Sequence, residues 1–201
     1  MKKIVLLFVV FALVSFRVAD SELTADERKL GVDRLTQSYD HMVKVIAGLT
    51  PAQLNYKSSA TSWSVAECAE HIAITESSIW GMVEGALKQP ADPSKRGEVK
   101  MTDDVLVNMM TDRSSKFKTQ EMCEPKQKFG SFDGSVKEFK EKRKAHIEYI
   151  KSTKDDLRNR YAVAPFGTID AFQAVLFLAA HSERHTKQME EVIASAGFPK
   201  K

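Results

Sequence analysis

Apolar residues recur every three or four positions along most of this chain, in long segments separated by short polar stretches. Such spacing puts the apolar side chains on one face of a helix, so each segment predicts an amphipathic helix. The predicted helices cover residues 25–47, 65–87, 136–161 and 169–196, with a weaker one from Thr102 through residue 116. Residues 171–180, AFQAVLFLAA, are apolar nearly all round, which predicts that the last helix is the most buried.

Three of these helices begin with the sequence signature of a capping box, a Ser or Thr followed three residues later by Glu. In a capping box the hydroxyl and the carboxylate each accept a hydrogen bond from a backbone N–H that the first helical turn leaves free. The three pairs are Thr24 with Glu27, Ser64 with Glu67, and Ser135 with Glu138. No segment has the pattern of a strand. We therefore predict an all-α four-helix bundle, in which each apolar stripe is buried against the others.

The amino terminus, MKKIVLLFVVFALVSFRVADS, has two lysines, an apolar run and then small and polar residues, which is the layout of a secretory signal peptide. The run is shorter than the roughly 20 apolar residues of a membrane span. We expect residues 1–19 to be a signal peptide, although Arg17 is a poor match to the cleavage pattern and an uncleaved anchor stays open. Residues 20–201 then form one domain, exported to the periplasm or secreted, with no stable membrane insertion after cleavage.

The charge of the mature protein argues against one class of partner. The chain has 30 basic and 27 acidic residues, and removal of residues 1–19 takes away Lys2, Lys3 and Arg17 but no acid, leaving 27 of each. The mature protein is then formally neutral. Its composition therefore predicts no nucleic-acid partner.

The two cysteines, Cys68 and Cys123, could form a disulfide in an exported protein. Cys68 falls on the apolar stripe of a predicted helix, whereas Cys123 lies in a polar loop. We therefore favour one buried and one exposed free thiol.

The clearest candidate for chemistry is the pair His181 and His185, because residues four apart project from the same face of a helix and can share a metal ion. Ala174 and Leu178 precede them on that face, so both imidazoles are expected to point into the bundle, and Gln188 continues the face. The alternative is a polar stripe on the bundle surface.

His71 is the candidate for a third ligand, because catalytic metal sites commonly have three protein ligands and one open position. It lies beside Cys68 and Ile72 on an inward stripe, where an unpaired imidazole would be costly to bury. The alternative is a core histidine that hydrogen-bonds a carbonyl group or Glu67. Thr75 and Glu67, one turn away on either side, could orient the ring.

Four further residues have simpler interpretations. Glu67 is a weak candidate for a general base, since its position in the capping box already explains it. Trp63 is expected to pack at the bundle end rather than to stack on a substrate. His41 and His146 lie among charged residues and are expected at the surface or its boundary.

The segments TSWSVAECAEHIAITESSIW around His71 and AAHSERHTKQMEEV around His181 and His185 resemble the DinB superfamily of DinB/YfiT-like metal-dependent enzymes. The resemblance covers nearly the whole mature chain. It implies a four-helix bundle in up-down-down-up order, often as a homodimer. It also implies a zinc or nickel site whose ligands here are His71, His181 and His185.

The resemblance leaves several functions open. Some relatives are thiol-dependent transferases or isomerases, but their thiol cofactors belong to the reducing cytoplasm, and this chain carries a predicted export signal. The leading hypothesis is therefore an extracytoplasmic metal-dependent hydrolase that acts on an unknown small-molecule substrate. The alternatives are a non-catalytic bundle that binds metal or a small ligand, a thiol-dependent transferase, and a purely structural bundle.

Overall fold

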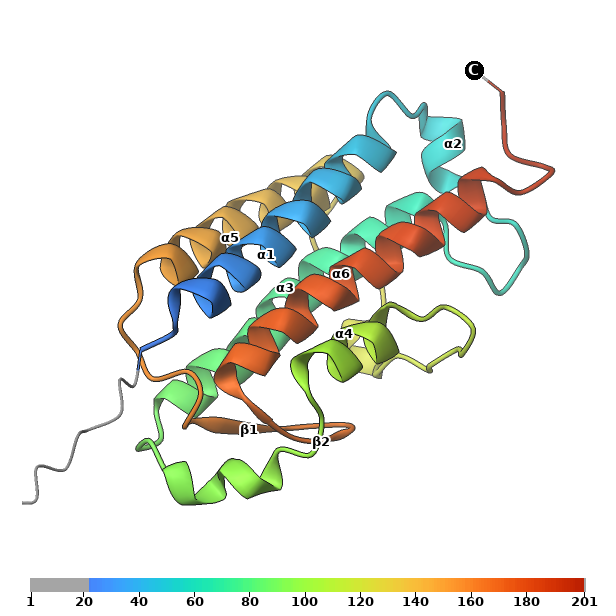
Figure 1. The fold of residues 1–201 in the computed structure, drawn as a ribbon. Helices are drawn as coiled ribbons and strands as arrows, with labels where there is room; N and C mark the ends of the chain where they lie inside the picture. Colours follow the sequence, from blue (N-terminus) through green and yellow to red (C-terminus); the bar gives the residue numbers. More distant parts are fainter. Residues whose placement is uncertain (1–21, 201) are drawn as a thin grey trace, which may run out of the picture.

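Four long helices lie side by side along one axis in the computed structural model, which describes residues 22–200 (Figure 1). The predicted signal peptide, residues 1–19, lies outside this range. The helices are α1 (Ala25–Ile46), α2 (Pro51–Asn55), α3 (Val65–Leu87), α4 (Asp103–Thr111), α5 (Phe132–Ser152) and α6 (Ala171–Ile193), with 3-10 turns η1 (Pro93–Glu98) and η2 (Glu121–Cys123) and strands β1 (Tyr161–Ala164) and β2 (Gly167–Asp170). Within residues 22–200, none of the helices is long and apolar enough to cross a membrane.

Helices α1 and α6 run in one direction, and α3 and α5 run in the other (Figure 1). Two long-range hydrogen bonds agree with this. Arg28, at the start of α1, donates to the carbonyl of Ile150 near the end of α5 at 2.8 Å, and Gln53, beyond the end of α1, donates to the carbonyl of Pro199, beyond the end of α6. The order is the up-down-down-up order that the resemblance implies.

Helix α6 is the most buried of the long helices, as its all-round apolar character predicted. Fifteen of its 23 residues are buried, against 13 of 23 in α3. Its Phe172 is completely buried. A Cβ atom added to Gly31 of α1 would lie only 2.9 Å from the Phe172 ring. Glycine at this position therefore lets α1 pack closely on α6, and burial of a ring such as Phe172 contributes about 1.5–3 kcal/mol.

Helices α1 and α3 agree closely with the prediction, and their two capping boxes, Thr24 with Glu27 and Ser64 with Glu67, are confirmed. Helix α4 begins after Thr102 as predicted but ends at Thr111, short of residue 116. Beyond it, Asp112 accepts hydrogen bonds from the backbone N–H and the hydroxyl of Ser114. This local bonding competes with continued helix.

The predicted capping box of Ser135 with Glu138 is wrong, because α5 begins one turn earlier. Its N-cap is Ser131, whose hydroxyl accepts from the N–H of Gly134, and Ser135 is buried inside the helix. A Cβ on residue 134 would lie 2.3 Å from the carbonyl oxygen of Phe129, so only glycine fits this start. The helix also ends at Ser152 rather than near residue 161, since Thr153 accepts from the N–H of Asp155 in a turn.

The prediction that no segment forms a strand is also wrong. Strands β1 and β2 form an antiparallel hairpin with Ala164 opposite Gly167, joined by Pro165 and Phe166. Gly167 has φ of +123°, a conformation that other residues rarely adopt. The hairpin ends at Asp170, which caps α6 by accepting a hydrogen bond from the N–H of Gln173. Helix α6 therefore begins two residues later than predicted. It ends at Ile193, three residues earlier than predicted.

Candidate metal centre

The structure brings the three predicted histidines together between α3 and the antiparallel α6. His71 lies in the second turn of α3, and His181 and His185 lie one turn apart on α6. Their candidate ligand nitrogens all lie within 4.8 Å of one another. The ring centroids of His71 and His185 are 4.4 Å apart, and those of His181 and His185 are 4.6 Å apart.

Each of the three rings makes its hydrogen bond through Nδ1. The Nδ1 of His71 donates to the carbonyl of Cys123 at 2.7 Å, and that of His185 donates to the carboxamide oxygen of Gln188 at 2.9 Å. The Nδ1 of His181 has a longer contact of 3.4 Å with the hydroxyl of Thr75, which donates to the carbonyl of His71. A neutral imidazole whose Nδ1 carries the proton has its lone pair on Nε2, which is the atom free to bind a metal.

Burial keeps these imidazoles neutral. Burial lowers the pKa of His71, although its hydrogen bond to Cys123 opposes the effect. Burial also lowers the pKa of His181 and of His185 well below the ordinary value, and the positive charge that the neighbouring histidines would carry lowers both further. All three are therefore neutral at pH 7, which is the form that binds a metal ion.

The donor set fits a divalent transition-metal ion. Three neutral imidazoles suit zinc, nickel and several neighbouring metals. Ligand atoms around a tetrahedral zinc ion lie about 3.4 Å apart, since each bond is about 2.0–2.1 Å long. The observed limit of 4.8 Å is longer than that spacing, so the rings would have to move closer together around an ion. His71 is 2% exposed, whereas His181 and His185 keep part of their surface open, which leaves a side for a further ligand.

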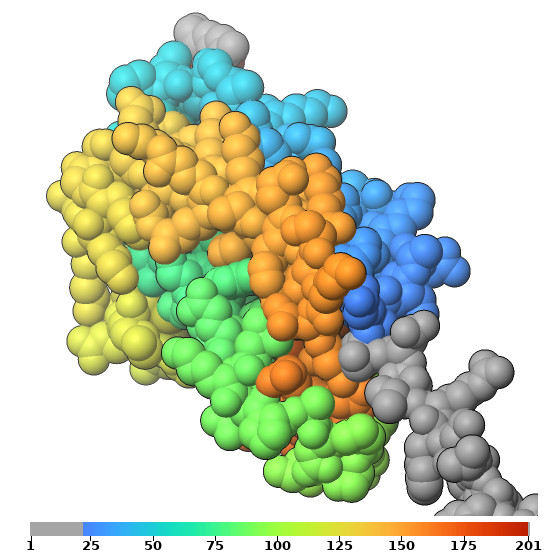
Figure 2. Space-filling model, turned by 90° about the vertical axis from the view of Figure 1, so that its left-hand side faces the viewer, coloured from blue at the N-terminus to red at the C-terminus, as the bar shows by residue number. Residues whose placement is uncertain are grey.

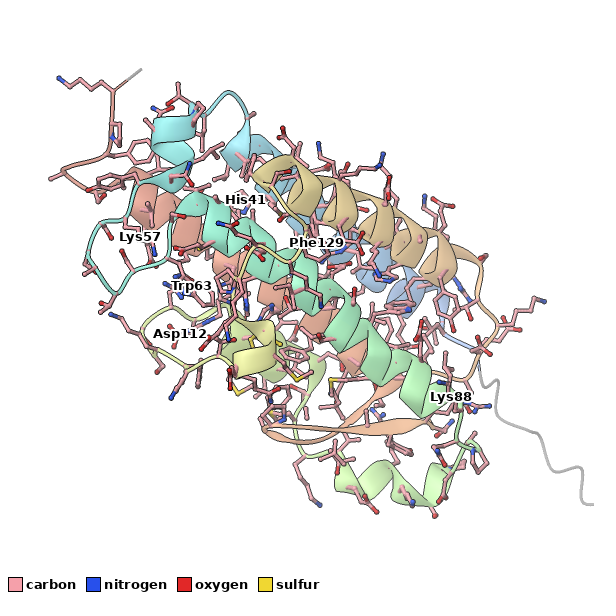
Figure 3. The ribbon with its side chains drawn as sticks, turned by 180° about the vertical axis from the view of Figure 1, so that it is seen from behind. His41, Lys57, Trp63, Lys88, Asp112 and Phe129 are labelled. Carbon is pink, nitrogen blue, oxygen red and sulfur yellow. The ribbon has the colours of Figure 1, made fainter. Side chains whose placement is uncertain are left out.

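Trp63 forms one wall of this site. Its ring centroid lies 4.8 Å from that of His71 and 5.9 Å from that of His185. Figure 3 labels Trp63. Trp63 also packs against the apolar cluster at this end of the bundle, as expected. The contact with two of the three histidines was not foreseen.

The segment from Asp112 to Ser131 covers another side of the site, and Figure 2 shows it in yellow against α3. Two contacts hold it to α3. The carbonyl of Cys123 accepts from His71, and a carboxylate oxygen of Glu70 accepts from the N–H groups of Lys126 and Lys128 at 3.1 and 2.6 Å. The segment therefore supplies the hydrogen-bond partner that orients one candidate ligand.

The cysteines of this region are both free and both buried. The expected exposure of Cys123 is therefore wrong, because its chain segment is pressed against His71. Burial raises the pKa of the Cys68 thiol far above its usual range.

Glu67 has the role that its place in the sequence favoured. One carboxylate oxygen accepts from the N–H of Ser64 at 2.8 Å, and the other binds the ammonium group of Lys57 at 2.7 Å. Both oxygens are thus engaged in the cap and an ion pair.

The sequence interpretation missed a buried polar network deeper in the bundle. The guanidinium of Arg143 binds both oxygens of Glu76, at 2.8 and 2.7 Å, and both side chains are completely buried. Arg143 also donates to the hydroxyls of Ser38 and Ser182, so the network joins all four long helices. A signal was available, since Arg143 lies four residues from both Phe139 and Ile147 on the apolar stripe.

His146 belongs to this network, so its predicted surface position is wrong. It is 7% exposed, its Nδ1 lies 2.9 Å from Glu76, and its ring stacks on Trp80 with centroids 3.8 Å apart. His41 lies at the boundary as predicted, with one ring nitrogen on Glu183 and the other on Glu190.

Comparison with known proteins identifies the family and the fold. A family model described as the DinB superfamily matches residues 34–189. The uncharacterised protein YuaE of Bacillus subtilis (strain 168) is 26% identical over 148 residues, which are 73% of this chain and 87% of YuaE. The solved structure of YfiT from Bacillus subtilis, described as a probable metal-dependent hydrolase with an unusual four-helix bundle topology, has a TM-score of 0.58 and 14% identity. The match covers 88% of this chain and 91% of YfiT.

Proposed function

The chain belongs to the DinB superfamily, and we propose that it is a metal-dependent hydrolase whose metal ion is held by His71, His181 and His185. One observation carries the proposal: three neutral imidazoles have their candidate ligand nitrogens within 4.8 Å of one another. The description of YfiT as a probable metal-dependent hydrolase supports the same class of reaction.

The residues of the site would hold the ion and prepare the substrate position. The Nε2 atoms of the three histidines would be its ligands, and the contacts of Nδ1 with Cys123, Thr75 and Gln188 would keep each ring in place. A bound divalent ion lowers the pKa of water and polarises a carbonyl or phosphoryl group, which is what hydrolysis at neutral pH requires. Trp63 excludes water from one side and offers an aromatic face to a substrate.

The metal in this proposal is zinc or nickel, since imidazole nitrogen suits both and affinity order alone does not select between them. The location in the proposal is outside the cytoplasmic membrane, because the amino-terminal residues have the layout of a signal peptide. Separating the cell fractions and sequencing the amino terminus of the protein tests this location directly. A mature chain that begins near residue 20 is the expected result, and an intact Met1 in the cytoplasmic fraction would contradict it.

Metal content is the first test of the site. We expect elemental analysis of protein purified without an affinity-tag metal to find about one divalent ion per chain. A double variant with His71→Ala and His181→Ala should lose the ion, whereas the matched control His41→Ala should keep it. Retention of metal in the double variant would contradict the site. If the wild type binds metal and the double variant does not, a screen of hydrolase substrates on the metal-loaded wild type tests the reaction.

A second function, metal binding without catalysis, is favoured by the state of the nearby carboxylates. Glu67 is engaged with Ser64 and Lys57, and Glu70 with the backbone of Lys126 and Lys128. Both oxygens of Glu67 and one oxygen of Glu70 are therefore already engaged. Stoichiometric metal together with no turnover of ester, amide or phosphoester substrates would support this second function over hydrolysis.

A further inference from the structure

The chain on both sides of Arg113 is bonded to α6, at the residue before His185. Arg184, the residue before His185, is buried and donates to the carbonyl oxygens of Asp112 and Ser115. These two residues flank Arg113, so Arg113 is confined to the part of α6 that carries His185. Figure 3 labels Asp112 on the same side of the bundle as Trp63, whose ring lies against His185.

The guanidinium of Arg113 already binds a carboxylate. Its Nε and Nη2 donate to the two oxygens of Glu191 at 3.0 and 2.8 Å, which is the paired geometry that a guanidinium offers to a carboxylate. Glu191 lies one helical turn beyond Gln188, whose side chain orients His185. The Glu191 side chain is 54% exposed and that of Arg113 is 20% exposed. Glu191 can therefore turn out into water while Arg113 stays in place.

The charge of Arg113 acts on the site itself. Burial is the main reason for the low pKa of His185, and the positive charge of Arg113 lowers that pKa further. The same charge opposes the rise that burial causes in the pKa of Cys68. Such effects weaken with distance and solvent screening, which agrees with the position of Arg113 against this part of α6.

The surroundings of Arg113 provide room and charges of both signs. A shallow groove of about 670 Å³ along α4 and α6 is lined by the cations Arg113 and Lys187 and by the acids Asp112, Glu190 and Glu191. The positive charge of Lys116 acts on Glu191 as well. Glu67 and Glu70, the two carboxylates on α3 nearest to His71, already have partners, as described above. A carboxylate in this groove would therefore compete with Glu191 for the guanidinium of Arg113.

We infer that Arg113 binds a carboxylate of the substrate, which takes the place of Glu191 while the group to be hydrolysed lies at the three histidines. This inference rests on the proposed function and names its substrate class, a small molecule with a free carboxylate. The exchange replaces one exposed carboxylate by another on the same guanidinium. It costs little because an exposed ion pair contributes little to stability.

The test uses two metal-binding probes that differ in one terminal group, a methyl in one and a carboxylate in the other. Butyrohydroxamic acid has a neutral tail, and the monohydroxamic acid of succinic acid has a carboxylate at the same position. Their dissociation constants are measured by titration of the visible spectrum of the cobalt-loaded protein. We expect the carboxylate probe to bind at least about tenfold more tightly, which corresponds to one charge-assisted hydrogen-bonded pair. The glutaric acid homologue tests the distance from metal to guanidinium.

Four variants separate Arg113 from general electrostatics. Arg113→Ala should abolish the preference for the carboxylate probe while leaving affinity for the neutral probe within about twofold. Arg113→Lys should keep only part of the preference, because an ammonium group keeps the positive charge but lacks the paired N–H donors of a guanidinium. Glu191→Gln should increase the preference by removing the competing carboxylate. Lys142→Ala, which removes another paired surface cation on α5, should change nothing.

The outcomes distinguish the two proposals. Equal affinities of the two probes for the cobalt-loaded wild type, or an unchanged preference in Arg113→Ala, would overturn the role of Arg113 and leave the metal site intact. An equal loss in Lys142→Ala would also overturn it. If a matching phosphonate probe bound more tightly than the carboxylate probe, the inferred substrate class would be wrong, and a phosphate-like anion would take the place of the carboxylate. Failure of the wild type to bind cobalt would overturn the proposed function, and the inference with it.

Discussion

The buried network around Glu76 and the three-histidine site both contain histidine side chains. They differ in the partners that their polar atoms find within the protein. In the buried network, Glu76 binds Arg143 and His146, so opposite charges compensate each other in the core. In the three-histidine site, the rings are neutral and all their hydrogen bonds are made by Nδ1. The first group is complete within the protein, whereas the second has three candidate ligand nitrogens within 4.8 Å of one another. That difference separates a structural cluster from a binding site.

The electrostatics of the two groups follow the same division. Burial alone would raise the pKa of Glu76, but the adjacent Arg143 outweighs it and lowers that pKa below its usual value. Burial of the three histidines lowers their pKa values without an opposite charge to offset it. Glu76 is therefore ionised, whereas the three histidines of the site are neutral. Four changes test this contrast.

The largest effect on stability is expected from Glu76→Ala. Removal of this carboxylate leaves the guanidinium of Arg143 buried without its counter-charge, so we expect a loss of about 3–5 kcal/mol in the free energy of unfolding. Chemical denaturation measures it. A double variant with Glu76→Leu and Arg143→Met should recover most of the loss, because no unpaired charge remains. A loss below about 1 kcal/mol in Glu76→Ala would show that the pair is not a structural element.

His185→Ala should act on the other group in the opposite way. We expect metal affinity to fall by at least about 100-fold, since loss of a ligand should exceed the loss of a residue that orients one. The fold should persist, because the apolar faces of four helices hold the bundle together rather than the ion. Elemental analysis and far-UV circular dichroism measure the two quantities. An unfolded His185→Ala protein would reveal a metal site that stabilises the fold.

Gln188→Ala should produce a smaller effect of the same kind. The carboxamide oxygen of Gln188 lies 2.9 Å from Nδ1 of His185 and fixes the ring. Loss of such a partner typically lowers metal affinity about 10–100-fold. Competition with a chromophoric chelator measures this change, and Gln188→Glu, which keeps an acceptor, should restore most of it. Wild-type affinity in Gln188→Ala would mean that packing alone orients His185.

The smallest effect on stability is expected at His41, which has carboxylate partners where the three histidines of the site have none within residues 22–200. Burial alone would lower the pKa of His41, but its hydrogen bonds to Glu183 and Glu190 outweigh this and raise it. A raised pKa stabilises the fold below the unfolded value of about 6.5, and the stabilisation disappears as the pH rises through the folded pKa. His41→Ala should therefore lose less than about 1 kcal/mol at pH 6 and nothing at pH 9. Thermal unfolding at both pH values measures this, and a pH-independent difference would contradict it.

Much of the fold and the three histidines could be predicted from local sequence. The period of apolar residues and the capping boxes of Thr24 and Ser64 lie within one or two helical turns, and such signals give α1 and α3 almost to the residue. The spacing of His181 and His185 is equally local. The errors at helix ends arose where two local signals compete, as at Ser135, where Ser131 one turn earlier is the true cap and Gly134 allows that earlier start.

The sequence by itself therefore determined the long helices, the burial of α6 and the histidines that could bind a metal. Only the tertiary structure decided which groups complete each cluster. The carbonyl that orients His71 comes from Cys123, 52 residues away, and Glu76 meets Arg143 across 67 residues. The carboxylate on Arg113 comes from Glu191, 78 residues away. Such partners are chosen by how the helices pack against one another, and helical periodicity carries no information about contacts over that separation.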